Sequence, residues 1–182
     1  MLLGNYVAKS MAFETSNSSK LQMTDSISIR QGLTSDADRL AEFNSSMAFE
    51  TEGIKLLPEV IGAGVNRLIS DPNLGYYLVA ESEGQIVASL MVTTEWSDWR
   101  NGLFWWIQSV YVIPEFRRKG LYRKLYEKVK ELAAADPSIC GFRLYVEKEN
   151  TVAQRTYENV GMHETEYKMY EELRQGLKFQ ES

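Results

Sequence analysis

The chain has 182 residues, enough for one domain that buries a substantial core. Hydrophobic residues make up 44% of it and charged residues 25%, as in an ordinary globular protein. With 20 basic and 25 acidic residues the formal net charge is −5, so the surface as a whole does not favour nucleic acid or an anionic membrane. One cysteine and one histidine exclude an internal disulfide framework and any multi-cysteine or histidine-rich metal site.

Residues 1–25 are rich in Ser, Thr, Asn and Lys and show no sustained hydrophobic period, so we expect a flexible extension. They lack the basic start, apolar run and cleavage site of a signal peptide. No stretch approaches the ~20 apolar residues that span a membrane. The sequence therefore predicts a soluble, cytoplasmic protein without a membrane partner, with one domain at 26–175 and a tail at 176–182. Met-Ala-Phe-Glu-Thr occurs at 11–15 and 47–51, but this echo is too short to be a structural repeat.

The domain is predicted to open with a strand at 27–31, followed by a helix that begins at Asp36 and is capped by Thr34 or Ser35. We expect the inward positions of this helix to be Ala37, Leu40, Ala41, Phe43 and Met47. A second helix is predicted at 58–69, because its first residue is a proline, which is well tolerated there.

Three strand-like runs follow, at 76–80, 86–93 and 103–113. The first two flank Glu83-Gly84-Gln85, which is typical of a hairpin turn. The third run is almost continuously apolar, as expected for a central strand covered on both faces. Apolar residues then recur at helical spacing, at Leu121, Leu125, Val129 and Leu132.

The last elements are predicted as a strand at 142–146, a helix at 151–160 and a strand at 164–170. Helices thus fall on either side of a mostly antiparallel sheet that contains one strand–helix–strand unit. This pattern predicts a mixed α/β, or α+β, single domain.

The segment from Val110 to Tyr122 joins the end of the apolar strand to a basic turn and a helix start. Pro114 ends the strand, because it cannot continue the ladder. A helix start presents unpaired N–H groups and the positive end of the helix dipole, and Gly120 lets a ligand approach the backbone. Cations are unfavourable there, yet three precede the helix: Arg117, Arg118 and Lys119. An anion, with pyrophosphate as the obvious candidate, would explain them.

These residues taken alone are also compatible with a basic turn in which the glycine only bends the chain. A P-loop is excluded, because the lysine of that motif is followed by Ser or Thr, whereas Lys119 is followed by Gly120. The sequence also has no Gly-x-Gly-x-x-Gly after a strand, which argues against a Rossmann site.

The segment resembles the acetyl-coenzyme A motif of the GNAT N-acetyltransferase superfamily. That motif, Arg/Gln-x-x-Gly-x-Gly/Ala, is matched at 117–122, except that Tyr122 stands where the family has Gly or Ala. A second segment at 150–162 is similar to the family's Asn-x-x-Ala-x-x-x-Tyr-x-x-x-Gly-Phe. With the order of elements, the resemblance covers about residues 26–172. It implies a GNAT-like fold, with a twisted, mostly antiparallel sheet of six to seven strands flanked by about four helices.

The resemblance also implies where acetyl-coenzyme A would bind, as co-substrate and without a metal. The backbone of Val110 and Val112 would pair with the pantetheine arm like an added strand, and the amides from Arg117 to Tyr122 would hold the pyrophosphate. A bulge would separate the central strand from strand 142–146, and the thioester would lie in that gap. The implied cofactor-binding residues are Val110, Tyr111, Val112, Arg117, Arg118, Lys119, Gly120, Leu121, Tyr122, Asn150 and Tyr157.

Tyr157 is the expected general acid, because a phenol is protonated at neutral pH and can give its proton to the leaving thiolate of coenzyme A. By helical periodicity alone, Tyr157 would be a core residue. Asn150 is the expected N-cap of its helix and a contact of the cofactor.

The general base is assigned tentatively to Glu95, because Gln108 in the central strand cannot accept the proton of a protonated amine. Asp98 is an alternative, and each acid could equally be a solvated loop residue. Trp96 and Trp99, with Asp98 and Gln108, are the tentative substrate-binding residues, as an aromatic wall near the acceptor. Trp105 and Trp106 should point to opposite faces of one strand.

The sequence thus predicts an N-acetyltransferase (EC 2.3.1.-) that moves an acetyl group directly to a primary amine of a small molecule or peptide. The alternative is a catalytically silent acyl-coenzyme A-binding module used for sensing or interaction. A nucleic-acid partner is not expected, because the basic cluster is short and the domain acidic. The amine acceptor stays open, as does the oligomeric state, although homodimers are common among relatives.

Overall fold

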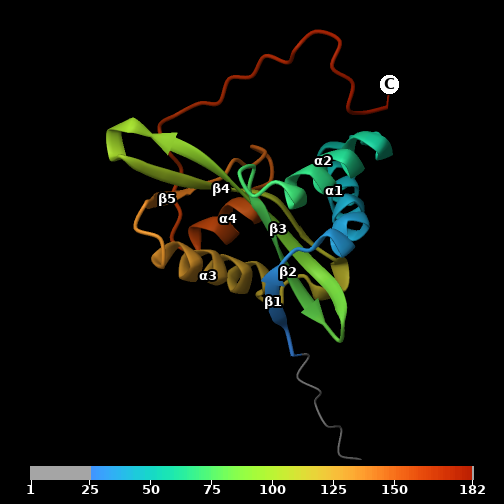
Figure 1. The fold of residues 1–182 in the computed structure, drawn as a ribbon, viewed down its shortest axis with the longest axis horizontal. Helices are drawn as coiled ribbons and strands as arrows, with labels where there is room; N and C mark the ends of the chain where they lie inside the picture. Colours follow the sequence, from blue (N-terminus) through green and yellow to red (C-terminus); the bar gives the residue numbers. More distant parts are fainter. Residues whose placement is uncertain (1–25, 182) are drawn as a thin grey trace, which may run out of the picture.

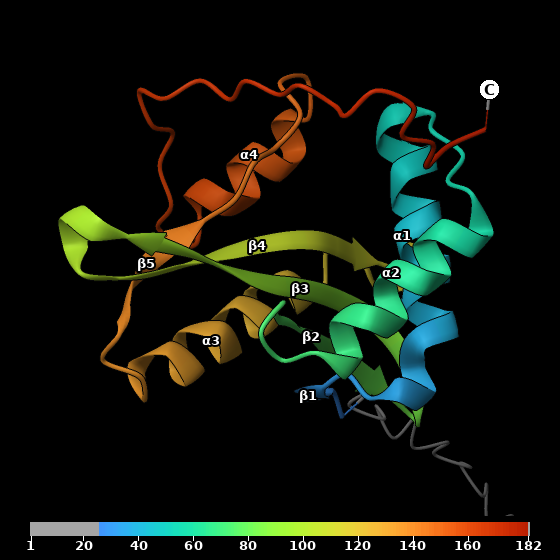
Figure 2. The same ribbon diagram turned by 45° about the horizontal axis from the view of Figure 1, so that its top comes forward.

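The computed structural model of the protein describes residues 26–181 (Figures 1 and 2). The predicted extension at 1–25 lies outside these residues. In chain order the elements are β1 (Ser28–Gln31), η1 (Thr34–Asp36), α1 (Ala37–Glu52), α2 (Pro58–Ser70), β2 (Tyr76–Ser82), β3 (Gln85–Ser97), η2 (Asp98–Arg100), β4 (Gly102–Val112), η3 (Pro114–Phe116), α3 (Leu121–Ala134), β5 (Ile139–Arg143) and α4 (Thr151–Glu158). Within this part of the chain, no helix has both the length and the apolar composition needed to cross a membrane.

The five strands form one sheet in the order β1-β2-β3-β4-β5, and only the β4–β5 pair is parallel. In Figures 1 and 2 α1 and α2 cover one face and α3 covers the other. The prediction of a mixed α/β, mostly antiparallel fold with four helices is confirmed. The prediction of six to seven strands is wrong for the described residues, which form five.

Alternating residues of the central strands form the two cores. Leu78 and Leu90 lie on the α3 face, in a cluster that includes Leu125 and Val129. Tyr77 and Val79 point the opposite way, against α1 and α2. Successive side chains of a strand point to opposite faces of the sheet. Helices on both faces are therefore needed to bury the apolar side chains of these strands.

The inner face of α1 was predicted in part. Ala37, Leu40 and Phe43 are buried, as expected from the helical period. The prediction for Met47 is less accurate, because the buried stripe continues through Ala48 and leaves Met47 half-buried. Leu132 of α3, which was also expected inside, is 36% exposed near the end of its helix.

The β2–β3 hairpin confirms its predicted turn. Glu83 and Gly84 are its two central residues, with φ angles of 50° and 76°. Positive φ at both positions is the signature of the two-residue turn whose twist matches that of the strands.

A partly buried ion cluster of one arginine and two carboxylates fixes the start of the domain to the sheet. The guanidinium of Arg30 on β1 donates to Asp36 at 2.6 Å and to Glu81 on β2 at 2.9 Å. Asp36 is 7% exposed, and the hydrogen bonds from Arg30 hold the pKa of its carboxyl below its usual range. The contacts of Arg30 with Asp36 and Glu81 therefore join β1, β2 and the turn before α1.

The central strand β4 carries a bulge that opens the sheet. The pairing with β3 passes from Ser89↔Tyr111 to Met91↔Gln108, so β4 has one more residue than β3 in this interval. Ser109 takes up the irregularity with a φ of 48°. On its other side β4 pairs with β5 only as far as Trp106↔Arg143. Beyond Trp106 the two parallel strands separate.

This separation explains an error in the predicted position of β5. The strand was expected at 142–146 but runs from Ile139 to Arg143, because residues 144–146 have no ladder partner once β4 departs. The strand predicted at 164–170 is also wrong, since that segment is exposed and forms no ladder. Its apolar and polar residues alternate, but alternation without a neighbouring strand does not make a sheet.

Candidate functional site

The loop between η3 and α3 exposes a continuous run of backbone donors. None of the amides from Arg118 to Arg123 donates a hydrogen bond to a described residue, and the first bond of the helix is Lys124 N to Gly120 O, at 3.1 Å. Arg118 and Gly120 have φ angles of 61° and 76°. Left-handed residues in such a loop turn successive N–H groups toward one point, and the helix dipole adds positive potential. The arrangement can hold a phosphate or pyrophosphate.

Arg117, which begins the matched motif, is engaged within the protein. Its amide donates to Pro114 O at 3.2 Å, and its Nε to Val112 O at 2.8 Å. Its Nη2 donates to the carboxylate of Glu50 on α1, at 2.6 Å. The same carboxylate accepts from the hydroxyl of Tyr111, at 2.8 Å. The free donors thus begin one residue later than expected, and Arg117 instead ties the loop to α1.

The other two cations of the loop leave the amides uncovered. Lys119 folds back over the ring of Phe116, with its Nζ 4.5 Å from the ring centroid. Arg118 is exposed and makes no salt bridge or hydrogen bond to another described residue. Arg118 is thus the cation of this loop that can reach a bound anion without giving up a contact.

Tyr122, the departure from the family motif, does not obstruct the loop. Its side chain is 8% exposed and points into the core, where it stacks on Tyr126 with ring centroids 6.0 Å apart and meets Tyr157 edge-on at 5.2 Å. Only its backbone faces the run of free amides. The bulky residue is therefore compatible with an anion at this helix start.

Tyr157 lies on α4, against Tyr122. Like Val110 and Val112, the residues after the bulge, it packs against the α3-side core. Burial raises the pKa of Tyr157, so its hydroxyl is protonated at neutral pH. Asn150 caps α4 as predicted, accepting from Ala153 N at 3.1 Å. The structure thus places Tyr157 against the same core as the residues after the bulge, and Asn150 caps its helix.

Glu95, the tentative base, sits in a cluster on the other face of the sheet. Its carboxylate accepts from Arg143 at 2.7 and 2.8 Å and from the indole N–H of Trp106. Partial burial alone would raise the pKa of Glu95, but these hydrogen bonds outweigh it and the pKa is lowered. Arg143 also stacks on Phe104, with its Cζ 3.8 Å from the ring centroid. This carboxylate is occupied, and its lowered pKa makes it a weaker base.

Glu95 also lies at a distance from the bulge. It pairs with Phe104, four residues before Gln108 on β4, which corresponds to about 13 Å along a strand. Trp96 and Trp99 are farther still, at the exposed tip of the β3–β4 hairpin, with exposures of 58% and 84%.

Of the other two residues predicted to bind the acceptor, one lies at the tip of the β3–β4 hairpin and one beside the bulge. Asp98 lies at the hairpin tip, where its carboxylate accepts from Trp99 N at 2.8 Å. Gln108 lies beside the bulge. Trp105 belongs to the α3-side core and Trp106 to the Glu95 cluster, so their predicted opposite directions are confirmed.

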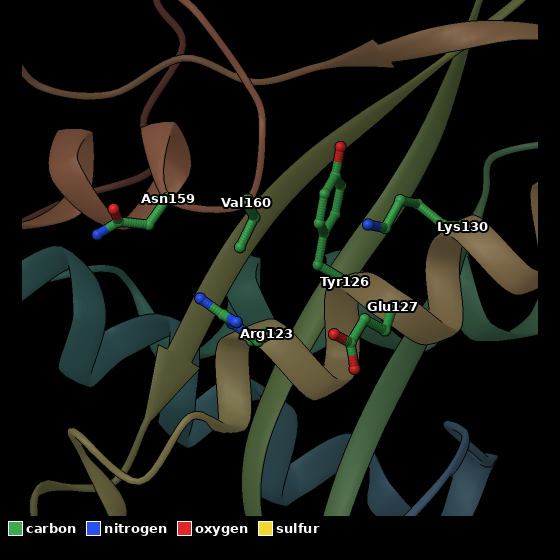
Figure 3. A pocket seen from close by; sticks show the side chains of 6 residues that line it. All are labelled: Arg123, Tyr126, Glu127, Lys130, Asn159 and Val160. Carbon is green, nitrogen blue, oxygen red and sulfur yellow. The ribbon is translucent and has the colours of Figure 1, made fainter.

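A hollow of about 160 Å³ lies between α3 and the turn after α4 (Figure 3). In Figure 3 Tyr126 stands between Val160 and Lys130 with its hydroxyl directed away from the α3 backbone. The lining residues are Arg123, Tyr126, Glu127, Lys130, Asn159 and Val160. The hollow continues from the run of free amides along α3, because Arg123 belongs to both.

Sequence reasoning missed Glu50, Tyr126, Arg143 and the amide of Arg123. Glu50 lies within the echoed pentapeptide at 47–51, but nothing in that echo indicates a link to Arg117. Arg143 is an isolated cation in an apolar strand, which is a signal for a buried or half-buried partner.

Comparison with known proteins agrees with this geometry. The profile of the acetyltransferase (GNAT) family matches residues 37–162, more than half of the chain. A crystal structure of "a possible acetyltransferase from Clostridium difficile 630" is 47% identical, with a TM-score of 0.76, and covers 81% of this chain and 97% of that one. No curated protein matches the chain.

Two more distant structures share the fold. A "predicted acetyltransferase with acetyl-CoA" from Clostridium acetobutylicum is 18% identical, with a TM-score of 0.67 and coverage of 80% of this chain and 96% of that one. An aminoglycoside N-acetyltransferase in complex with CoA is 15% identical, with a TM-score of 0.65 and coverage of 81% and 95%. By the family match over residues 37–162, the chain belongs to the acetyltransferase (GNAT) family.

Proposed function

We propose that the protein transfers an acetyl group from acetyl-coenzyme A directly to a primary amine of a small molecule or peptide. The observation that carries this proposal is the run of free amides from Arg118 to Arg123, which lies beside a sheet opened at Ser109. The amides and Arg118 would bind the pyrophosphate. The free edge of β4 at Val110 and Val112 would pair with the amides of the pantetheine arm, which places the thioester in the split.

The proposed chemistry uses Tyr157, which packs against the same core as Val110 and Val112. The amine nitrogen attacks the acetyl carbonyl, the C–S bond breaks, and the sulfur leaves with the electron pair. Tyr157 donates its proton to this thiolate. The new amide nitrogen loses a proton to solvent, and a proton from solvent restores the phenol of Tyr157. Burial keeps the phenol protonated at neutral pH, which is the form that an acid must have before the transfer.

We assign Glu95 a role in holding the acceptor amine rather than in removing its proton. Its carboxylate is already shared with Arg143 and Trp106, and it lies about 13 Å from Gln108 along the strand. A cationic amine held beside this cluster would lose its proton to water rather than to the carboxylate, whose charge Arg143 already balances. The aromatic ring of Trp106 would add a cation–π contact.

The acceptor class is best sought with amines of different size. Among the structural neighbours are an aminoglycoside N-acetyltransferase and a ribosomal-protein-alanine N-acetyltransferase, at 15% and 16% identity. Such identities show the fold alone, so both classes belong in a panel with polyamines and amino acids. Release of free coenzyme A thiol, measured across this panel, identifies the acceptor.

Tyr157→Phe tests the mechanism. We expect kcat to fall about 100-fold or more, since a positioned general acid contributes at least that factor, while the Kd for coenzyme A stays the same. Tyr170→Phe is the matched control, because Tyr170 is 90% exposed on the C-terminal segment and should behave like the wild type. Unchanged turnover in the Tyr157 variant would remove the assigned role.

The second candidate is a silent acyl-coenzyme A-binding module. The engaged carboxylate of Glu95 favours it, because none of the predicted acids then stands free beside the bulge. Calorimetry separates the two functions: binding of acetyl-coenzyme A without thiol release across the whole panel would establish the module.

A further inference from the structure

The hydroxyl of Tyr122 is buried without a hydrogen-bond partner among the described residues. The hydroxyl oxygen is itself shielded from bulk solvent. Buried polar groups are nearly always paired, and an unpaired one costs free energy that phenylalanine at the same place would not. The hydroxyl therefore calls for a partner in another state of the enzyme.

The surroundings of Tyr122 narrow the choice of partner. Its ring meets the ring of Tyr157 edge-on, with centroids 5.2 Å apart and an angle of 65° between the planes. Its other neighbour, Tyr126, stacks almost parallel, at 5°. Burial, with the nearby Tyr157 and Tyr126, raises the pKa of Tyr122, so its O–H is a donor throughout the working pH range. The adjacent phenol of Tyr157 is the group that becomes charged during the reaction.

We propose that Tyr122 is a positioning residue that acts through Tyr157, by donating a hydrogen bond to the phenolate that forms when Tyr157 protonates the leaving thiolate. No proton leaves Tyr122. The proton of Tyr157 goes to sulfur, the phenolate accepts the hydrogen bond, and a proton from solvent, released there by the amide nitrogen, restores Tyr157. The inference rests on the proposed role of Tyr157 as general acid.

The placement of Tyr122 suits this task. It is the second residue of α3, so its backbone belongs to the run of free amides while its side chain reaches α4. One residue thus connects the proposed pyrophosphate site with the proposed acid. In this structure the hydroxyl of Tyr122 has no partner within hydrogen-bond distance, so its bond to Tyr157 forms only when the two phenols move closer together.

Tyr122→Phe tests the inference, and the chain offers a matched control. Tyr76 also has a buried hydroxyl without a partner, but it packs against Trp105 in the core. Tyr122→Phe and Tyr76→Phe should each raise Tm, because each variant removes a buried hydroxyl that has no hydrogen-bond partner. Only Tyr122→Phe should lower kcat, by about tenfold, the factor expected when a hydrogen bond to a developing charge is lost. The KM for acetyl-coenzyme A should not change.

The double variant shows whether Tyr122 acts through Tyr157. In the Tyr157→Phe background no phenolate forms, so adding Tyr122→Phe should have no further effect on kcat. Equal losses in both backgrounds, or wild-type kcat in Tyr122→Phe, would overturn the inference while leaving the acetyltransferase function intact. Full turnover in Tyr157→Phe alone would instead overturn the role of the acid, and this inference with it.

Discussion

Gly120 offers a direct test of the pyrophosphate site, because the chain contains a second glycine of the same geometry. Gly120 and Gly84 both have a φ of 76°, and a Cβ added to either meets no atom within 4 Å. An alanine in this left-handed conformation costs about 1 kcal/mol, so Gly120→Ala and Gly84→Ala should each lower Tm by about 2–4 °C. Stability alone therefore does not distinguish the two variants.

Their effect on cofactor binding should differ. The new methyl group at 120 lies among the free amides, whereas that at 84 lies in the β2–β3 turn. Displacing one hydrogen bond to a charged phosphate costs about 1.5–3 kcal/mol, so the Kd for coenzyme A should rise about tenfold to hundredfold in Gly120→Ala only. Calorimetric titration and thermal unfolding of both variants provide the measurements. Equal Kd values in the two variants would refute the assignment of this loop to the pyrophosphate.

Two further variants test the ionic contacts. In Asp36→Asn we expect a loss of about 1–3 kcal/mol in the free energy of unfolding at pH 7, measured with urea. Arg30 keeps the pKa of Asp36 below its unfolded value of about 3.9, so the extra stability of the wild type should be complete above pH 3.9 and vanish as the pH falls through the folded pKa. A difference in the free energy of unfolding that stays constant down to about pH 2 would contradict this. Glu50→Gln should raise the KM for acetyl-coenzyme A a few-fold, because it breaks the ion pair that holds the Arg117 loop to α1. The increase in KM should be smaller at high salt, since salt already screens an ion pair whose two side chains are about 40% exposed. Glu42→Gln, on the outer surface of the same helix, should leave KM unchanged.

Local patterns in the sequence predicted those parts of the fold whose cause is local. The apolar run of β4 reflects coverage on both faces, and the β2–β3 turn reflects Gly84, which accepts positive φ at no steric cost. The position of β5 depends instead on where β4 leaves it. Within β5, position 141 requires a glycine, because a Cβ there would lie 2.7 Å from Cε1 of Phe104; the sequence alone does not reveal this contact.

The candidate site divides in the same way. The loop from Arg118 to Gly120 is contiguous in sequence, so its charge, glycine and helix start could be recognised together. The partners of Arg117 and Glu95 come from α1 and β5, and a single sequence contains no signal that joins them. For the same reason the base could be named only tentatively, and the direction of the Tyr122 side chain depended on packing with α4.

The divergence of β4 from β5 leaves an unpaired backbone edge inside a folded domain rather than at its rim. Such an edge normally recruits other chains and leads to aggregation. Here residues 107–112 have no partner in β5, and Val110 and Val112 pack against the α3-side core. This edge is the one with which the proposed pantetheine arm would pair, so the ligand would occupy the position that a strand of another chain could otherwise take.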